Sequence, residues 1–537
     1  MRRRDVLKAG MATAVLGGLA RAEEPAAARP NVLWLMTDEQ RADSLGCYGA
    51  PWVHSPNLDR LAREGVVFTA AYTQAPVCTP ARICMLTGQY CANSSVWQNI
   101  GRHELKFRFL TDIFRDAGYA SATFGKQHYG GPRRAFDLER SLVISQAVDC
   151  YGYAEQYDER QYDVVKHPTG WVLGGTYPAP VEQAMEYRCV EEAKRWLEEL
   201  EEGRPFLLRL SFSAPHTPVV PPPPFDTMIA EEDIKLPSEA DPLPPDCAVW
   251  MRGRGASSDP LTPEQTRKMR RFYYGYCAFV DHEFGRLLDW MKERGLLDNT
   301  IVAFLSDHGT HLCDHGRVQK GTFYDPSARV PLFFWYPPAI AGPRVLHTPV
   351  ETRSLLPTLL NLAGLPTPDY CADSSLAGAL REGREPEARP VFSGMAFGFD
   401  PKHPDNRVVM VRDGDWKLTV CPDAPEVAGE LVNLADDPHE QHNRYGAPEV
   451  SATQERLWGL VRGHLASTEK PFPNVQVLDA LVINDAGETV CPLCRRTKIR
   501  RVDPTPDWSE GLRPAYVCGH CGTRFGMRAD TDAGADG

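Results

Sequence analysis

Long apolar runs, excess positive charge and internal repeats are all missing from this chain of 537 residues, and each absence excludes a class of protein. After residue 22 no apolar stretch is long enough to span a bilayer, which argues against an integral membrane segment in the processed chain. Lysines and arginines number 59 against 71 aspartates and glutamates, and the net charge of −12 argues against general nucleic-acid binding. The absence of repeats excludes a solenoid. The remaining composition, 42% hydrophobic and 24% charged, is ordinary for a globular protein.

Residues 1–22 have the features of an export signal. Residues 3–8, RRDVLK, resemble the twin-arginine motif; an apolar run follows over 9–20, and residues 20–22, ARA, match an A-x-A cleavage site. The alternative, a basic tail before a core helix, is disfavoured because that helix would lack a polar face. We therefore expect the twin-arginine export machinery as a partner and a periplasmic or secreted location.

Several apolar, β-rich segments run directly into polar clusters. They cover residues 31–37, 121–124, 206–212 and 301–305, and helical patterns such as 56–64 and 263–295 lie between them. Strands that alternate with helices predict an α/β fold with a mainly parallel sheet covered on both faces. Because ligands of such sheets bind beyond the carboxyl ends of the strands, we expect the polar clusters to meet there.

The pattern changes downstream of this first domain, which we place at residues 31–390. Short antiparallel strands are predicted at 406–420 and 429–434 and a helix at 448–466, so 391–470 should form a small α+β subdomain. A third segment is predicted at 485–527. The proline-rich, acidic stretch 215–262 is expected to be a long loop beside the carboxyl edge of the sheet, where such loops are usually functional.

Residues 78–88, CTPARICMLTG, form the most informative motif of the chain. Pro80 suits the first turn of a helix, so Cys78 is expected at its amino-terminal end, with Arg82 one turn further on the same face. Free N–H groups and the positive end of the helix dipole favour an anion beside residue 78. The guanidinium of Arg82 adds a fork matched to a tetrahedral oxyanion. A purely structural cysteine is the alternative.

This segment resembles the sulfatase signature C-x-P-x-R-x-x-x-x-T-G at every fixed position. The resemblance implies an alkaline-phosphatase-like fold and a sulfuric ester hydrolase in which a formylglycine-generating or radical maturation enzyme oxidises Cys78 to formylglycine. One hydroxyl of the hydrated aldehyde would attack sulfur and the second would expel sulfate. The implied substrate is a sulfated glycan or an aryl or alkyl sulfate.

Acidic and histidine side chains follow two of the predicted strands. Asp38 comes after the first of them, and Asp307 and His308 come after the last. Hard cations such as calcium or magnesium prefer carboxylate oxygens, and a cation there would neutralise sulfate and acidify the nucleophile. The resemblance implies calcium bound by Asp38, Glu39, Asp307 and His308 together with residue 78. Glu39 departs from the family pattern, which has aspartate at this position.

Further residues match the catalytic motifs of the family. Lys126 and His128 lie in GKQHYG, His216 lies in SFSAPHTP, and Lys320 follows HGRVQ. The resemblance implies that the two lysines bind sulfate, that His128 takes a proton from the second hydroxyl, and that His216 lies beside the leaving oxygen. Asn99 is a further candidate contact to the substrate. Each histidine taken alone is explained as well by a structural role.

The carboxyl-terminal segment carries two cysteine pairs. Cys491 and Cys494 precede Cys518 and Cys521, and 23 residues separate the pairs. This spacing predicts a four-cysteine zinc ribbon, in which structural zinc would supply most of the folding energy. Two disulfides are the alternative in an oxidising compartment.

Two other functions remain open from the sequence. A phosphonate or phosphodiester hydrolase would share the fold; Lys126 and His128 favour sulfate, whereas Glu39 leaves this alternative standing. A non-catalytic binder of anionic glycans could use the same fold, but it does not account for a complete catalytic set.

Overall fold

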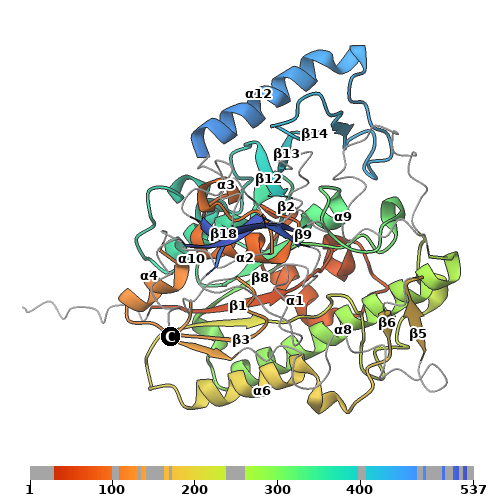
Figure 1. Ribbon diagram of the computed structural model, residues 1–537. Coiled ribbons are helices and arrows are strands. Elements are labelled where there is room, and N and C mark those ends of the chain that lie inside the picture. The colour runs from red at the N-terminus through yellow and green to blue at the C-terminus, as the bar shows by residue number, and fades with distance from the viewer. Residues whose placement is uncertain are drawn as a thin grey trace, which may run out of the picture.

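The computed structural model describes residues 29–99, 108–129, 135–140, 163–168, 172–236, 261–396 and 407–468, and the backbone of four short strands further on. At their centre is a nine-stranded sheet in the order β10-β2-β9-β8-β1-β7-β3-β4, with β11 paired to β2 (Figure 1). Of these described strands, β9 alone runs antiparallel to its neighbours, so the predicted mainly parallel sheet is confirmed. The strands are β1 (Asn31–Thr37), β2 (Val66–Tyr72), β3 (Ala120–Gly125), β4 (Leu138–Arg140), β7 (Phe206–Ser211), β8 (Thr300–Ser306), β9 (Arg329–Trp335), β10 (Arg344–Leu346) and β11 (Val350–Glu351).

Helices cover both faces of this sheet. Alternate residues of β1 point to opposite sides: Trp34 joins the core against α2, α4 and α10, whereas Leu35 joins the core against α1, α6 and α8. Both side chains are fully buried, as expected for a central parallel strand. The helices are α1 (Pro56–Glu64), α2 (Cys78–Thr87), α3 (Cys91–Ser94), α4 (Leu110–Asp116), α6 (Met185–Glu198), α8 (Pro263–Glu293), α9 (Asp325–Ala328), α10 (Leu355–Leu362) and α11 (Ala377–Glu382).

The long helix α8 shows how local sequence sets an element boundary. The Thr262 side chain accepts a hydrogen bond from the backbone N–H of Gln265, whose side chain bonds back to the Thr262 N–H, and Pro263 fills the first helical position. The helix therefore begins where the sequence predicts and ends two residues earlier than expected. None of the described helices combines the length and the apolar character needed to cross a bilayer.

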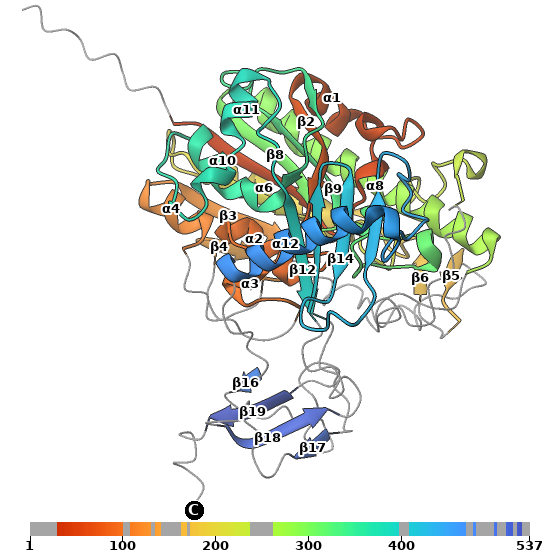
Figure 2. The same cartoon turned by 90° about the horizontal axis from the view of Figure 1, so that it is seen from above.

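A second, antiparallel sheet forms the small carboxyl-terminal subdomain. Its strands are β12 (Val391–Ala396), β13 (Arg407–Asp413), β14 (Trp416–Val420) and β15 (Glu430–Asn433), in that order, and α12 (Ser451–Thr468) packs across them (Figure 2). The predicted α+β unit is thus present, while the boundaries drawn between the domains stay a prediction.

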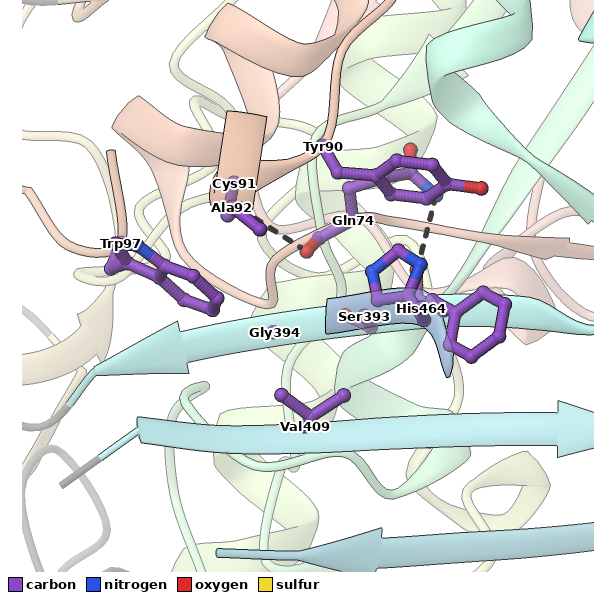
Figure 3. A pocket seen from close by; sticks show the side chains of 10 residues that line it. Gln74, Tyr90, Cys91, Ala92, Trp97, Ser393, Gly394, Val409 and His464 are labelled. Carbon is purple, nitrogen blue, oxygen red and sulfur yellow. Dashed lines mark hydrogen bonds between the residues drawn. The ribbon is translucent and has the colours of Figure 1, made fainter. Parts of the chain in front are cut away.

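A pocket lies where this small sheet meets α3 and α12 (Figure 3). The His464 ring stacks on Phe392 with centroids 4.0 Å apart and meets Tyr90 edge-on at 4.5 Å. Burial, together with nearby Arg353, lowers the pKa of His464 to about 3, so its ring is neutral. None of the residues predicted for catalysis lines this pocket.

Further strands follow α12. The strands β16 (Gln476–Leu478), β17 (Ile499–Arg501), β18 (Leu512–Cys518) and β19 (Arg524–Arg528) form a sheet in the order β16-β19-β18-β17. The predicted signal over 1–22 lies outside the described residues, and so do the cysteine side chains predicted to bind zinc.

Candidate active site

Four adjacent parallel strands deliver polar residues to one edge of the large sheet. The strands β8, β1, β7 and β3 are consecutive in the sheet, and all point the same way. Asp307 follows β8, Asp38 follows β1, Lys126 follows β3, and His216 comes shortly after β7. The contacts described below show that these clusters come together beyond the strand ends, as the sequence predicts.

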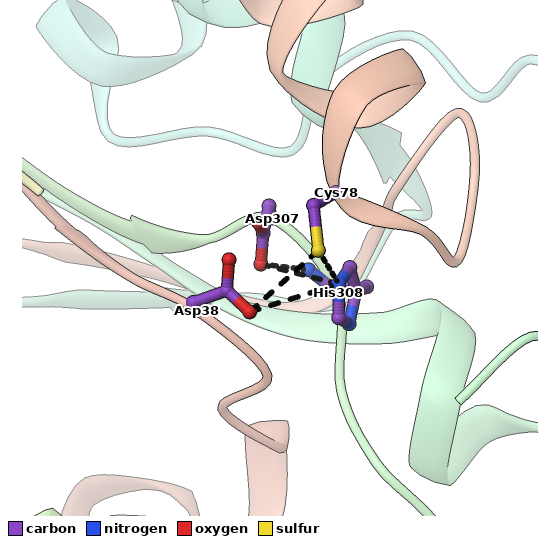
Figure 4. A group of neighbouring side chains, drawn as sticks. All are labelled: Asp38, Cys78, Asp307 and His308. Atoms are coloured by element: carbon purple, nitrogen blue, oxygen red, sulfur yellow. Dashed lines mark hydrogen bonds and ion pairs between the residues drawn. The ribbon is translucent and has the colours of Figure 1, made fainter. Parts of the chain in front are cut away.

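Cys78 is the first residue of α2 and is 1% exposed. Its Sγ lies 3.2 Å from Nε2 of His308 and 3.8 Å from Oδ1 of Asp38 (Figure 4). Nζ of Lys126 also lies 3.8 Å from this Sγ. Burial and Asp38 would raise the pKa of the thiol, but Lys126, Lys320 and His308 hold it well below its usual value. Residue 78 therefore lies in surroundings that stabilise negative charge.

Arg82 binds the carboxylates of the site and does not point into the region where a substrate would bind. Its Nη2 lies 2.7 Å from Oδ2 of Asp38 and its Nε 2.8 Å from Oδ2 of Asp307, and none of these side chains is exposed. Its Nη1 donates to the carbonyl of Lys126 and to Oγ of Ser211, both at 2.9 Å. Every nitrogen of the guanidinium is thus already bonded to protein, so Arg82 orients the groups around it.

Glu39 contacts Lys320 and His216, whereas Asp38 is the carboxylate near Cys78. The backbone of Glu39 has φ 67°, and its Oε2 lies 3.0 Å from Nζ of Lys320 and 3.4 Å from Nε2 of His216. Its Oε1 is buried and has no hydrogen-bond partner among the described residues. The longer side chain thus extends toward the lysine while keeping one oxygen free.

The donor set fits a hard divalent cation. Ligand atoms of Asp38, Cys78, Asp307 and His308 lie within 4.8 Å of one another, and Asp38 also groups with Glu39 and His216. Nδ1 of His308 bonds the Gly309 carbonyl at 2.9 Å, which directs Nε2 into the cluster, as in most histidine ligands. Carboxylates and the free oxygen of Glu39 are the ligands that calcium and magnesium prefer.

Two lysines flank this cluster. Nζ of Lys126 lies 2.8 Å from Oδ2 of Asp38, and Nζ of Lys320 lies 2.6 Å from Nε2 of His216. Burial opposes the charge on Lys320, yet Cys78, Glu39 and Asp38 raise its pKa above its usual value. Both lysines are therefore positive and lie where a sulfate group beside residue 78 could reach them.

The remaining predicted residues lie at the rim. Asn99 is exposed, and its Oδ1 accepts a hydrogen bond of 2.8 Å from the backbone N–H of Thr79, so it caps the start of α2. His128 is exposed with φ 40°, and within the described part of the chain its ring makes no hydrogen bond or ion pair. The structure thus leaves His128 accessible, in the loop next to Lys126.

Sequence reasoning missed Arg209, which is fully buried in β7. Its Nη2 donates to Oε1 of Gln127 at 2.5 Å and its Nε to Oγ1 of Thr123 at 3.0 Å, while its guanidinium lies 4.8 Å from the Phe136 ring. It therefore supports the loop that carries Lys126. The available signal was an arginine inside an otherwise apolar strand.

Comparison with known proteins identifies the family of this chain. The family model described as Sulfatase matches residues 30–365, more than half of the chain. This chain belongs to the sulfatase family. A second model, described as N-sulphoglucosamine sulphohydrolase, C-terminal, matches residues 313–465 of the sulfatase and so includes its small subdomain.

Several curated relatives of this chain are named sulfatases. The chain is 30% identical over 505 residues to iduronate 2-sulfatase of Homo sapiens, covering 77% of this chain and 91% of that one. Choline-sulfatase of Rhizobium meliloti is 29% identical over 450 residues, covering 80% and 85%. Among solved structures, the phosphonate monoester hydrolase of Agrobacterium radiobacter superposes with a TM-score of 0.69 at 25% identity, covering 86% and 99%. The sulfatase is accordingly a sulfuric ester hydrolase with an alkaline-phosphatase-like fold.

Proposed function

We propose that the sulfatase removes sulfate from a sulfated glycan or a small aryl or alkyl sulfate, using formylglycine made from Cys78. The observation that carries this proposal is the position of Cys78 at the start of α2, with its Sγ 3.2 Å from His308 and 3.8 Å from both Asp38 and Lys126. A helix start beside a lysine and a cluster that could hold a metal ion is a place where negative charge on residue 78 is stabilised.

Calcium or magnesium would be bound by Asp38, Glu39, Asp307 and His308 beside residue 78. When bound, the cation supplies positive charge against the sulfate oxygens and acidifies the nucleophile. Arg82 keeps Asp38 and Asp307 ionised and oriented, because its guanidinium bonds both carboxylates.

The chain's own residues bind sulfate and move the protons. Lys126 and Lys320 lie on either side of Asp38 and Glu39 and would bind the sulfate oxygens as negative charge develops. Hydrated formylglycine at residue 78 would supply the hydroxyl that displaces the alcohol at sulfur. Asp38, whose Oδ1 lies 3.8 Å from Sγ of Cys78, would take the proton of that hydroxyl, and the leaving alcohol would take a proton from the Lys320–His216 pair. His128 then accepts the proton of the second hydroxyl as sulfate departs and the aldehyde is regenerated.

Peptide mass spectrometry tests the nucleophile. Chain co-expressed with a maturation enzyme should carry an aldehyde or its hydrate at residue 78, and sulfate release should rise with the modified fraction. Cys78→Ala is the matched control and should release no sulfate. Full activity in protein whose Cys78 is entirely unmodified would contradict the mechanism.

A phosphonate or phosphodiester hydrolase is the second candidate function, because phosphonate hydrolases share the fold of this chain. Parallel kcat/KM measurements on an aryl sulfate and the corresponding aryl phosphonate monoester discriminate the two. The sulfatase proposal requires a clear preference for the sulfate; a preference for the phosphonate would reassign the substrate.

Export and a zinc ribbon complete the proposal. The twin-arginine-like residues 1–22 support periplasmic or secreted location. The antiparallel pairing of β17 with β18 and of β18 with β19 supports a ribbon, because Cys518 ends β18 and Cys521 lies between β18 and β19 in sequence. Deleting residues 485–537 should remove one zinc ion per chain and spare activity on a small sulfate ester. Elemental analysis that finds no zinc, with no free thiols at Cys491, Cys494, Cys518 and Cys521, would favour disulfides.

A further inference from the structure

Two sequence segments of the small subdomain that have no role in the site above come together in the structure. Lys417 lies in β14 and Glu440 lies in the loop after β15, and their side chains form a buried ion pair. Lys417 is 3% exposed and Glu440 5%. A buried ion pair of this kind is weak grounds for stability, since apolar residues of the same volume often serve as well. Its geometry therefore requires another explanation.

The pair forms hydrogen bonds with residues 323 and 325, a few positions after Lys320. Nζ of Lys417 donates to the carbonyl of Phe323 at 3.0 Å and lies 2.8 Å from Oδ1 of Asp325. Glu440 in turn accepts a hydrogen bond of 2.5 Å from the backbone N–H of Asp325. Backbone and side chain of this short segment are thus both bonded to the small subdomain.

The residues around these contacts are fixed from several sides. The Tyr324 hydroxyl bonds the Glu430 carboxylate of β15, and the Tyr324 ring stacks on His315 with centroids 3.8 Å apart. Nε2 of His311 lies 2.6 Å from Oγ1 of Thr322. The segment between Thr322 and Asp325 is therefore clamped between the small sheet and the loop that follows β8.

Lys320 is separated from this clamped segment by a single glycine. Gly321 has φ 93°, a backbone conformation that residues with side chains rarely adopt, so glycine suits the turn between Lys320 and Thr322. On the other side of that turn, the ammonium of Lys320 reaches Glu39 and His216.

We propose that Lys417 is a positioning residue of the active site: by holding Phe323 and Asp325 it fixes the turn that delivers Lys320 to His216. The inference rests on the proposed roles of Lys320 and His216 in protonating the leaving alcohol. It makes the small subdomain a structural part of the catalytic machinery, although none of its residues need touch the substrate.

A series of aryl sulfates with leaving phenols of graded acidity tests this. In Lys417→Met, kcat should fall about 10- to 100-fold, the size expected when a catalytic group is displaced by about 1 Å. The loss should be greatest for the least acidic phenols, because those depend most on a proton from the Lys320–His216 pair. Lys320→Ala should steepen the dependence in the same direction. Arg462→Met, which removes an exposed ion pair with Glu455 on α12, is the matched control. It should leave both kcat and the dependence of kcat on leaving-group acidity unchanged.

A second variant separates positioning from folding. Lys417→Met/Glu440→Gln removes both buried charges, so it should recover stability lost by the single variant while keeping the steeper dependence on leaving-group acidity. An unchanged dependence in both Lys417 variants, with a steeper one in Lys320→Ala, would overturn the role of Lys417 alone. An unchanged dependence in Lys320→Ala would overturn the role of Lys320 in the proposed function, and that of Lys417 with it.

Discussion

The ammonium nitrogen of Lys320 lies 2.6 Å from Nε2 of His216. Nδ1 of the same ring bonds the carbonyl of Thr217, so Nδ1 carries the hydrogen and Nε2 presents a lone pair. The lysine is therefore the donor in this contact and Nε2 of the imidazole is the acceptor. The two groups share one proton, which in the proposed mechanism would pass to the leaving alcohol.

Replacing His216 should impair departure of the alcohol more than binding of the sulfate. In His216→Gln, the shared proton loses its acceptor, and kcat should fall about 10²- to 10⁴-fold on an alkyl sulfate. The loss should be far smaller on an aryl sulfate whose phenol is acidic enough to leave unprotonated. Steady-state kinetics on the two substrates checks this; equal losses on both would place His216 in sulfate binding.

Removing Arg82 should destabilise the fold as well as the activity. Arg82→Met would leave Asp38 and Asp307 buried without their shared partner, and breaking a buried pair in this way costs about 3 to 5 kcal/mol. Urea denaturation measures the loss. Arg195→Met, which removes an exposed pair with Glu192, should stay within about 1 kcal/mol of the parent. A stable, inactive Arg82→Met protein would indicate instead that the guanidinium acts mainly on substrate.

Chelation should remove activity and stability together. A cation bound to Asp38, Asp307 and His308 in the folded chain stabilises it, by about 2.7 kcal/mol at a concentration 100 times its Kd. Dialysis against a chelator should lower Tm and abolish sulfate release, and added calcium or magnesium should restore both. Asp307→Asn should require more cation for the same Tm. Full activity after elemental analysis has shown that calcium and magnesium are gone would refute the assignment.

The stability of the protein should depend on pH through Glu186. This residue of α6 is buried and accepts a hydrogen bond of 3.1 Å from the Ala214 backbone, and burial raises its pKa from 4.5 to about 7. Because the folded state binds the proton more tightly, this contribution to stability is present below about pH 4.5 and is lost as the pH rises through about 7.

Glu186→Gln should remove that dependence while keeping an acceptor for Ala214. The variant should match the parent near pH 4 and exceed its free energy of unfolding by about 1 to 3 kcal/mol at pH 8. Denaturation at a series of pH values measures the difference. Glu182→Gln, at an exposed position just before α6, is the control and should show the parent's pH slope. Parallel curves for all three proteins would contradict the prediction.

Local patterns predicted the parts of the fold that depend on local physics. The helical spacing of apolar residues and the proline at its start predicted the helix that begins at Pro263. The alternation of strands and helices predicted a parallel sheet with its polar clusters at one edge. The placement of Cys78 at a helix start followed from Pro80 alone. These features depend on neighbours in the sequence, which the sequence displays directly.

Long-range partner choice could not be predicted in the same way. Arg82 was correctly expected one turn from Cys78, but that it bonds Asp38 and Asp307 depends on side-chain directions across three elements. The contact of Lys417 with Asp325 joins residues 92 positions apart, one in β14 and the other at the start of α9. Periodicity assigns a residue to a face; it does not say which distant group will lie opposite.

The burial of Cys78 bears on when this residue could be oxidised relative to folding and export. Because only 1% of the residue is exposed, an oxidising enzyme could not reach this thiol in the folded chain. If Cys78 is oxidised as proposed, oxidation would therefore have to precede the packing of α2 against the sheet. If residues 1–22 are the predicted twin-arginine signal, the order would be oxidation of Cys78, then folding, then transport. On this proposal, a molecule that folds with Cys78 unmodified would stay inactive, and the yield of active enzyme would be set before folding.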